Sequence, residues 1–375
     1  MKIAINCRLL LKDKLEGIGW YTYEISKRIA ENHPEHVFYF LFDRPFSKEF
    51  IFGDNVKPVI LSPQSRHPFL WYLWFEYSVS RFIKKSKIDL FFSPDGYLSL
   101  NTNTKTILTI HDLNFEHYPD QLPFLTRNYY KFFTPKFCKK ADAIITVSEE
   151  SKKDIIKQYN TAENKITKVY NGANSMYKPL NNIQKQEIRD RYAGGSKYFY
   201  FVGSLHQRKN ITNLIKGFNL FIDKTNANIK LLIVGDPMWK NNYIINIYDK
   251  LPNKNNIIFM GRKEINELTK ISAAAIALTF IPYFEGFGIP IAEAISCHTP
   301  VITSNISCLP EIAGDTAVYV NPDDINDISN AMIELSSNSN KRNKLIENCK
   351  SRKDIFSWDR AAEDIWKIIE NKLKC

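Results

Sequence analysis

Residues 280–294 read Phe-Ile-Pro-Tyr-Phe-Glu-Gly-Phe-Gly-Ile-Pro-Ile-Ala-Glu-Ala, which predicts a buried strand, a glycine-containing turn and the start of a helix. Gly286 and Gly288 let the backbone approach a ligand closely, and Pro290 suits the start of a helix, where its missing N–H costs nothing. The free N–H groups of such a helix start form an anion site. Glu285 and Glu293 flank it and can accept hydrogen bonds from hydroxyl groups. The alternative is a structural strand–turn–helix unit with two incidental glutamates, and a motif this short leaves both open.

Short apolar strands alternate with helices along the rest of the chain. Such alternation implies a mainly parallel sheet covered on both faces, with ligands at the carboxyl ends of its strands. A polar stretch after Tyr177-Lys178-Pro179 separates two series of this kind. We therefore predict an α/β protein of two doubly wound, Rossmann-like domains that face a cleft, residues 1–178 and 179–356. The expected strands are 3–6, 36–42, 59–61, 90–92, 106–110, 143–147, 198–202, 229–234, 257–260, 275–280, 300–303 and 317–320, and a long helix is expected over 70–85.

The composition is that of a soluble globular protein. The chain has 375 residues, 44% hydrophobic and 24% charged, which is enough for two cores. No apolar run approaches the roughly 20 residues that span a bilayer, and the N-terminal Met-Lys-Ile-Ala-Ile-Asn reads as a strand instead of a signal peptide, so we expect a cytoplasmic protein. The six cysteines are scattered without a C-x-x-C pair, and we expect buried thiols with neither a metal site nor a disulfide framework.

A second group of candidate residues follows the strand expected at 198–202. Gly203 opens a loop, and Arg208 and Lys209 stand just before a helix that begins near Ile211. Two cations at this place can hold a diphosphate and neutralise its charge as it departs. A basic pair before a helix is also commonly solvated surface, but its position after the first strand of a nucleotide-type domain favours a binding role.

Two further candidates lie in the first half of the chain. His111, followed by Asp112, ends the strand expected at 106–110, and strand ends line ligand sites in this fold. A lone histidine is often structural; a functional one here would hydrogen-bond a ligand or stabilise charge. Gly17-Ile18-Gly19 can cradle phosphate with backbone N–H groups, although paired glycines also make ordinary turns.

Taken in order, these motifs resemble those of the retaining GT-B glycosyltransferases of family 4 over nearly the whole chain. The family motif E-G-F-G-x-P-x-x-E, two glutamates separated by seven residues, is matched fully from Glu285 to Glu293. The other agreements are His111-Asp112, the stretch from Thr146 to Ile155, Val169-Tyr170-Asn171-Gly172, Gly203 with Arg208-Lys209-Asn210, Pro300-Val301-Ile302, Leu309-Pro310-Glu311 and Phe356-Ser357-Trp358.

The resemblance implies a GT-B fold with the donor nucleotide held mainly by the second domain and the acceptor approached from the first. It also implies that residues 357–375 form a helix that crosses back to the first domain. Glu285 and His111 become the catalytic candidates, with Glu285 at the donor sugar, while Glu293 meets the ribose. The implied donor-binding residues are Gly17, Gly19, Gly203, Ser204, Arg208, Lys209, Gly286, Phe287, Gly288, Ile289 and Glu293. Ser204 replaces the Arg of many members, which shifts diphosphate binding to Arg208 and Lys209, and Asn174 replaces a usual Asp.

The expected reaction is metal-independent hexose transfer with retention, the stereochemistry being implied by the family. The chain has no Asp-x-Asp triplet to hold a metal, and we expect no cofactor because the nucleotide-sugar is a substrate. Likeness to mannosyltransferases of the family makes mannose from GDP-mannose the first expectation, with a UDP-sugar open, in assembly of a surface polysaccharide such as O-antigen or capsule. The alternatives are a GT-B phosphorylase or epimerase, or a non-catalytic membrane- or nucleic-acid-binding adaptor on the same fold.

The net charge of +11 can attract nucleic acid, anionic lipid or a phosphorylated substrate. No nucleic-acid-binding motif accompanies it, so we expect no nucleic-acid partner. Two basic-aromatic stretches, residues 66–87 and 127–140, can lie on the anionic inner face of the plasma membrane and meet a lipid-linked or oligosaccharide acceptor. The alternative is that helices bury these aromatic rings and leave the lysines in solvent.

Overall fold

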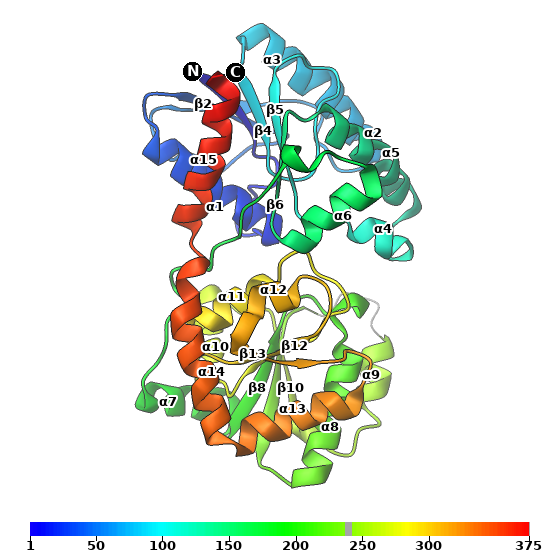
Figure 1. Cartoon of the computed structure of the whole chain (residues 1–375), viewed down its shortest axis with the longest axis vertical. Helices are drawn as coiled ribbons and strands as arrows, with labels where there is room; N and C mark the ends of the chain where they lie inside the picture. Colours follow the sequence, from blue (N-terminus) through cyan, green and yellow to red (C-terminus); the bar gives the residue numbers. More distant parts are fainter. Residues whose placement is uncertain (237–241, 375) are drawn as a thin grey trace. The chain divides into compact units, whose positions relative to one another are not determined.

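The computed structural model describes residues 1–236 and 242–374, and the chain divides into two compact units (Figure 1). Unit 1 comprises Met1–Asn171 and Ser357–Cys375, and unit 2 comprises Gly172–Phe356. The division between the units falls after Asn171, whereas we expected it after residue 178. The reason is packing: the segment that follows carries Tyr177, which is buried against Ala273 and Cys297 of unit 2.

In the described part of unit 1, seven parallel strands form one sheet in the order β3-β2-β1-β4-β5-β6-β7. The central strands are almost wholly apolar and buried, as a sheet covered on both faces requires. β3 carries Pro58 and lies at an edge, where the missing N–H is tolerated. The strands are β1 (Lys2–Asn6), β2 (Val37–Phe42), β3 (Val56–Ile60), β4 (Leu90–Ser93), β5 (Lys105–Ile110), β6 (Ala143–Thr146) and β7 (Ile166–Lys168).

The helix expected over 70–85 is present, with one local change. It consists of α2, a π-helical turn over Trp74–Val79, and α3, without a break in the chain. The turn buries Trp74, Phe75 and Glu76, and the Glu76 carboxylate accepts a hydrogen bond from the backbone N–H of Leu100 at 2.9 Å. The helices of unit 1 are α1 (Gly17–Asn32), α2 (Pro68–Leu73), α3 (Ser80–Ser86), α4 (Asn114–His117), α5 (Phe124–Lys140), α6 (Glu149–Tyr159) and α15 (Trp358–Lys374).

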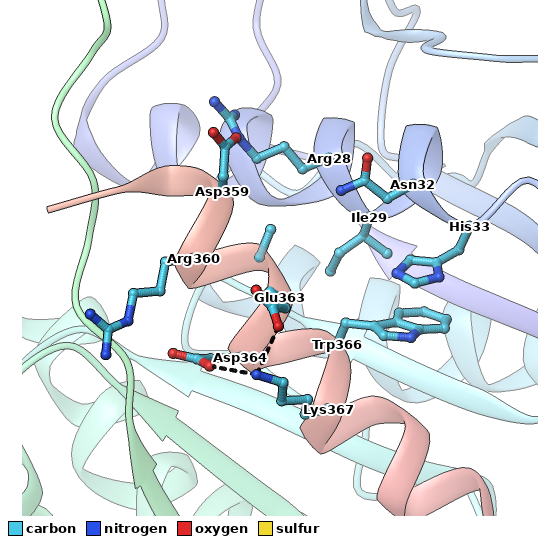
Figure 2. Close-up of a pocket in the computed structure, with 11 residues that line it drawn as sticks. Arg28, Ile29, Asn32, His33, Asp359, Arg360, Glu363, Asp364, Trp366 and Lys367 are labelled. Carbon is cyan, nitrogen blue, oxygen red and sulfur yellow. Dashed lines mark hydrogen bonds and ion pairs between the residues drawn. The ribbon is translucent and has the colours of Figure 1, made fainter. Parts of the chain in front are cut away.

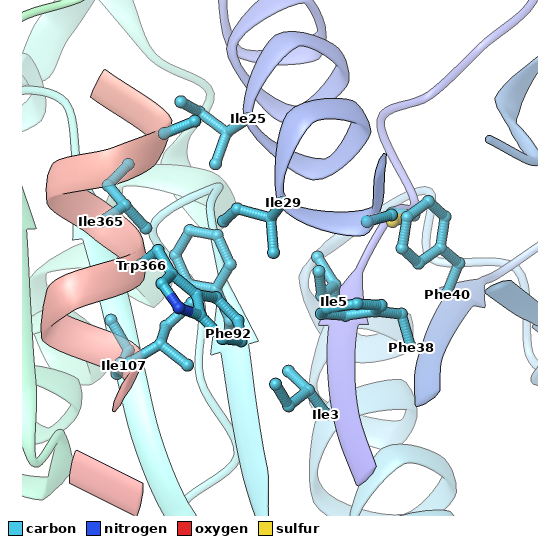
Figure 3. Close-up of a cluster of buried hydrophobic side chains, with 14 of the residues drawn as sticks. Ile3, Ile5, Ile25, Ile29, Phe38, Phe40, Phe92, Ile107, Ile365 and Trp366 are labelled. Carbon is cyan, nitrogen blue, oxygen red and sulfur yellow. The ribbon is translucent and has the colours of Figure 1, made fainter. Parts of the chain in front are cut away.

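The last helix, α15, belongs to the core of unit 1 (Figure 3). Its buried side chains recur every three or four residues, which gives it one apolar face. That face carries Ile365 and Trp366 and packs against Ile25 and Ile29 of α1 and the strands beside them. At its edge the indole of Trp366 stacks on the His33 imidazole, with ring centroids 3.6 Å apart.

A groove of about 690 Å³ runs between α1 and α15 (Figure 2). Charged side chains line it, and several of them are already paired. Arg28 of α1 donates to Asp359 of α15 at 2.5 Å and also pairs with Glu24, while Lys367 pairs with Glu363 at 2.9 Å. The pair of Arg28 with Asp359 ties the two helices together at the rim of the apolar contact, whereas the other two pairs lie within one helix each.

In the described part of unit 2, six parallel strands follow the order β10-β9-β8-β11-β12-β13, the order of a doubly wound nucleotide-binding sheet. The strands are β8 (Lys197–Val202), β9 (Ile229–Val234), β10 (Ile257–Gly261), β11 (Leu278–Phe280), β12 (Val301–Ser304) and β13 (Ala317–Val320). The helices are α7 (Asn182–Ala193), α8 (Ile211–Thr225), α9 (Asn242–Tyr248), α10 (Ile265–Ala274), α11 (Ile289–Ser296), α12 (Leu309–Ala313), α13 (Ile325–Ser337) and α14 (Ser339–Arg352). The prediction of two Rossmann-like units is confirmed.

Two expectations about local structure meet different outcomes. The polar stretch interpreted as a linker contains α7, which a capping box between Asn181 and Gln184 starts. Its apolar signal is weak because it buries only Ile188 and Ala193 among its described residues. The prediction of buried thiols is confirmed for five of the cysteines, and Cys375 lies outside the described residues.

Candidate active site

Four neighbouring strands of unit 2 end at one edge of the sheet, and the loops that leave them carry most of the candidate residues. β8 leads into residues 203–210, β11 into 281–288, β12 into 305–308, and β9 into Gly235 and Asp236. These strands are adjacent in the order β9-β8-β11-β12, so the loops lie side by side. The carboxyl edge of a parallel sheet is where ligands of this fold bind.

Glu285 pairs directly with Arg208 and Lys209. Its Oε1 lies 3.0 Å from Nη1 of Arg208 and also accepts a hydrogen bond from Nζ of Lys209. The three side chains are only 12, 17 and 13% exposed, respectively. The structure therefore joins the expected sugar-binding carboxylate and the expected diphosphate-binding cations in one cluster, a pairing that the sequence did not indicate.

The two cations of this cluster are held in fixed positions by other groups. Arg208 also donates to the Phe284 carbonyl, and Lys209 lies over the Phe280 ring, 5.0 Å from its centroid. Nε of Arg208 is buried and has no hydrogen-bond partner among the described residues. Two fixed positive charges side by side are suited to bind an anion.

Asn210 connects the cationic loop to the rest of the sheet edge. Its backbone is left-handed, with φ of +57°, and its buried side-chain amide donates to the carbonyl oxygens of Ile281 at 3.2 Å and Pro322 at 2.7 Å. Asparagine tolerates this backbone conformation better than most residues. Asn210 thereby fixes the loop of Arg208 and Lys209 against the loop of Glu285.

Gly203 and Gly235 make a close backbone contact at the ends of β8 and β9. Both have positive φ, +145° and +149°, and a Cβ on Gly235 would lie 1.9 Å from the Gly203 carbonyl oxygen. Gly235 is therefore required for the observed course of the expected phosphate loop, although sequence reasoning missed it. A glycine directly after an apolar strand was the available signal. Ser204, the next candidate, is exposed at the tip of this loop.

The turn between β11 and α11 places the next four candidates at the start of a helix. Gly288 has φ of +90° and caps the N-terminus of α11, so the backbone of Gly286, Gly288 and Ile289 lies at or just before the start of this helix. Phe287 differs from them, because its side chain is buried and packs edge-on against Phe356, with ring centroids 5.9 Å apart. For Phe287, a ligand could therefore use the backbone only.

Glu293 lies on α11 and is partly accessible to solvent. Burial by the surrounding protein raises the pKa of its carboxyl group to about 8, and the Tyr177 hydroxyl has a smaller, opposite effect. A carboxyl group that is partly protonated near neutral pH can donate as well as accept hydrogen bonds. That chemistry suits contact with hydroxyl groups of a ligand.

His111 lies in unit 1, directly after β5, and its ring is held in one orientation. Nε2 is 2.8 Å from the Pro94 carbonyl oxygen, which only accepts, so Nε2 carries the proton and donates. Burial lowers the pKa of His111, which favours a neutral ring with Nδ1 as an acceptor. The Tyr21 ring packs edge-on against it at 4.7 Å. Of the two roles expected, a neutral ring performs hydrogen bonding and does not supply positive charge.

His111 opens onto a pocket of about 220 Å³ in unit 1. His111 lines it together with Ile18, which places the Gly17–Gly19 turn beside the histidine, at the first turn of α1. A Cβ on Gly19 would lie 2.9 Å from the Leu9 carbonyl oxygen, whereas Gly17 has open space around it. Glycine is therefore needed at position 19, and backbone contact with a ligand remains a prediction for both.

A buried ion pair lies behind this pocket and was missed in the sequence. Nε of Arg8 is 2.6 Å from Asp95 Oδ2, and both side chains are almost fully buried. Asn6 donates to the other oxygen of Asp95 at 2.8 Å, and the Arg8 guanidinium lies over the Tyr97 ring at 4.2 Å. Asp95 also lines the pocket. These residues are far apart in the sequence and form no motif, so the fold alone reveals them.

Both units of the chain are similar to known glycosyltransferases. A sequence model described as "Glycosyl transferases group 1" matches residues 183–352, and one described as "Glycosyltransferase Family 4" matches residues 15–175. The chain is 30% identical over 275 residues to the O-antigen chain mannosyltransferase RfbU of Salmonella typhimurium, covering 71% of this chain and 72% of the relative. It is 24% identical over 360 residues to O-antigen chain mannosyltransferase B of Escherichia coli, covering 93% and 94%.

The fold is also that of a solved protein. HepE of Anabaena, solved in complex with UDP and glucose, superposes with a TM-score of 0.78 at 15% identity over 99% of this chain and 100% of that one. The chain belongs to the family 4, or group 1, glycosyltransferases, and its two Rossmann-like units are those of the GT-B fold. Within residues 1–236 and 242–374, no helix is long and apolar enough to cross a membrane.

Proposed function

We propose that this glycosyltransferase moves mannose from GDP-mannose to a lipid-linked or oligosaccharide acceptor during assembly of a surface polysaccharide such as O-antigen or capsule. The observation that supports the proposal is the cluster of Glu285, Arg208 and Lys209, from the two loops that follow β8 and β11. It provides a carboxylate for a sugar and two cations for a diphosphate. The choice of mannose and of the polysaccharide is supported by the two O-antigen mannosyltransferase relatives.

The proposed chemistry uses side chains of the protein where other transferases use a metal ion. Arg208, Lys209 and the N-terminus of α11 stabilise the negative charge that develops on the departing diphosphate. Glu285 holds hydroxyl groups of the donor sugar. The acceptor hydroxyl attacks the anomeric carbon from the face that the diphosphate leaves, and the diphosphate takes the acceptor proton. The new glycosidic bond then replaces the bond to phosphate with retained configuration.

A donor screen followed by a transfer assay tests the proposal. Thermal shift with GDP, UDP, ADP and their common sugars should show stabilisation by GDP and GDP-mannose, because a ligand that binds the native state stabilises it by mass action. Transfer of labelled mannose to a glycan acceptor should follow, with an axial product linkage by NMR and an unchanged rate in EDTA. Stabilisation by UDP-sugars alone would refute GDP-mannose, and turnover without an acceptor would indicate a phosphorylase or epimerase.

Replacing Lys209 by Ala tests the diphosphate role. A hydrogen bond to a charged group contributes about 1.5–3 kcal/mol, so we expect GDP and GDP-mannose to bind about 10- to 100-fold more weakly. Lys250→Ala, an exposed lysine of the same unit, is the matched control. Equal loss in affinity for the sugar-linked and free nucleotides places the contact at the diphosphate, and an unchanged affinity for both contradicts it.

We also propose that unit 1 attaches to an anionic membrane surface through α2, α3 and α5. Four large apolar side chains on α2 and α5 support this, since Phe69, Phe124, Leu125 and Phe132 are 64, 66, 68 and 58% exposed. Other aromatic residues of the two stretches, Trp74, Phe75, Tyr129 and Phe137, are buried, as the alternative reading expected. The exposed rings and the basic residues among them suit the boundary between lipid headgroups and acyl chains.

Charge reversal at the C-terminal end of α3 tests the membrane proposal. Replacing the exposed Lys84, Lys85 and Lys87 by Glu should release the protein from vesicles that contain phosphatidylglycerol. A charge-matched control replaces three exposed lysines of unit 2, Lys224, Lys344 and Lys350, by Glu. Equal vesicle binding by both variants and the wild type would overturn the proposal.

A further inference from the structure

Ser307 has a backbone conformation that serine rarely adopts. It lies in the loop between β12 and α12, with φ of +59°. The left-handed region is unfavourable for residues with a Cβ, and glycine enters it without that cost. A serine at this position therefore indicates that its side chain is used.

The Ser307 hydroxyl contacts both backbone polar groups of Glu285. It donates to the Glu285 carbonyl oxygen at 2.9 Å and accepts from the Glu285 N–H at 3.3 Å. The thiol of the next residue, Cys308, donates to the same carbonyl at 3.1 Å. The short loop after β12 thus holds both backbone polar groups of one residue in the loop after β11.

Glu285 depends on these contacts because of where it lies. β11 ends at Phe280 and α11 begins at Ile289, so Glu285 belongs to neither a strand nor a helix. Backbone polar groups that are shielded from water need partners, and Ser307 supplies one for each at this partly buried position. The Glu285 backbone is held by this loop, while its carboxylate is held by Arg208 and Lys209 of another.

We propose that Ser307 is a positioning residue for the transfer reaction, which sets the place of the Glu285 carboxylate relative to the donor sugar. The inference rests on the proposed function of Glu285. Ser307 itself touches neither substrate, and its effect passes through the backbone of Glu285. Its left-handed conformation is what directs the hydroxyl at that backbone.

The variant Ser307→Gly separates positioning from stability. Glycine relieves the unfavourable backbone conformation while the two hydrogen bonds are lost, so these effects oppose each other and the melting temperature should stay close to that of the wild type. The kcat for transfer should fall by about 10- to 100-fold, since a misplacement of about 1 Å can cost about a hundredfold. The KM for the donor should change much less, because Arg208 and Lys209 remain. A stably folded Ser307→Gly protein with wild-type kcat would overturn the inference.

Two further measurements complete the test. Asn226→Gly relieves a left-handed residue at the exposed end of α8, with φ of +49°, and should leave kcat unchanged. A crystal structure of Ser307→Gly should show the Glu285 peptide displaced and the ion pair with Arg208 lengthened from 3.0 Å. If Glu285 does not move in this crystal structure, the inference about Ser307 is overturned, whether or not the protein transfers sugar. If the wild type transfers no sugar, that result counts against the proposed function and not against the structural role of Ser307.

Discussion

At the residue scale, the negative charge of Glu285 is neutralised by neighbouring side chains before any ligand binds. Its carboxylate pairs with Arg208 and Lys209, the same side chains that are expected to meet the diphosphate. A diphosphate would therefore compete with Glu285 for these cations. Such an exchange would leave the carboxylate available for sugar hydroxyl groups once the nucleotide is in place.

Replacing Glu285 by Gln tests this exchange. We expect transfer to fall by at least about a hundredfold, because hydrogen bonds to the sugar that strengthen in the transition state are lost. GDP affinity should not fall, since Gln no longer competes with the phosphates for Arg208 and Lys209. Isothermal titration with GDP and steady-state transfer rates measure the two effects. Normal turnover would refute the role of Glu285, and a large loss of GDP affinity would refute the exchange.

Glu293 leads to a prediction about how stability depends on pH. The direction is opposite to that of a carboxylate whose pKa is lowered by folding. Burial raises its pKa to about 8 from a usual value of 4.5, so the folded state binds more protons than the unfolded state between these values. Stability should then fall as pH rises from about 5 to about 8. Glu293→Gln mimics the neutral form, and its melting temperature relative to the wild type should rise over that range. If the difference in melting temperature between Glu293→Gln and the wild type stayed constant over this pH range, it would contradict the raised pKa.

The sequence indicated part of this site and could not indicate the rest. Glu285, Glu293, Arg208 and Lys209 stand in motifs with fixed spacing, and the structure gathers three of them at one cluster. Ser307 was invisible because its importance lies in a backbone angle and in a contact with a residue 22 positions away.

At the scale of elements, hydrophobic patterning predicted the strands that are buried on both faces of a sheet. It failed for elements that bury few side chains. The strand expected at 317–320 coincides with β13, and the one expected at 90–92 is one residue short of β4. β7 was missed because it has three residues and lies at a sheet edge. α7 was missed because its helix is specified by its capping box more than by an apolar face.

The contact between α8 and α13 depends on a glycine inside a helix. A Cβ on Gly217 would lie 2.5 Å from Cγ2 of Ile328, closer than real Cβ contacts come. Alanine favours a helix over glycine by about 1 kcal/mol, but overpacking costs about 1–3 kcal/mol. Gly217→Ala should therefore lower the free energy of unfolding despite its better helix propensity. Urea denaturation measures this, with Lys216→Ala on the same helix as control. A stabilised Gly217→Ala protein would contradict the prediction.

At the scale of the whole molecule, the order of elements along the chain predicted two units and placed the boundary after residue 178, several residues beyond the observed division at Asn171. A boundary depends on which core a linker side chain enters, and Tyr177 enters that of unit 2. Unit 1 is discontinuous, because α15 supplies part of its core. Unit 2 is continuous, from Gly172 to Phe356.

This continuity leads to a prediction about unit 2 alone. Residues 172–356 contain a complete six-stranded sheet in the described part of the chain and all of Arg208, Lys209, Glu285 and Glu293. Because its core needs no element of unit 1, we expect the fragment to unfold in one cooperative transition. It should bind GDP, or the nucleotide that the full chain prefers, because it keeps these four residues. We expect its affinity to lie within about tenfold of the full-chain affinity, a difference of about 1.4 kcal/mol in binding free energy. Lys209→Ala in the fragment should weaken that binding as it does in the full chain. A fragment that folds without binding nucleotide would show that the donor site requires residues of unit 1, and one that fails to unfold cooperatively would show that the core of unit 2 is incomplete alone.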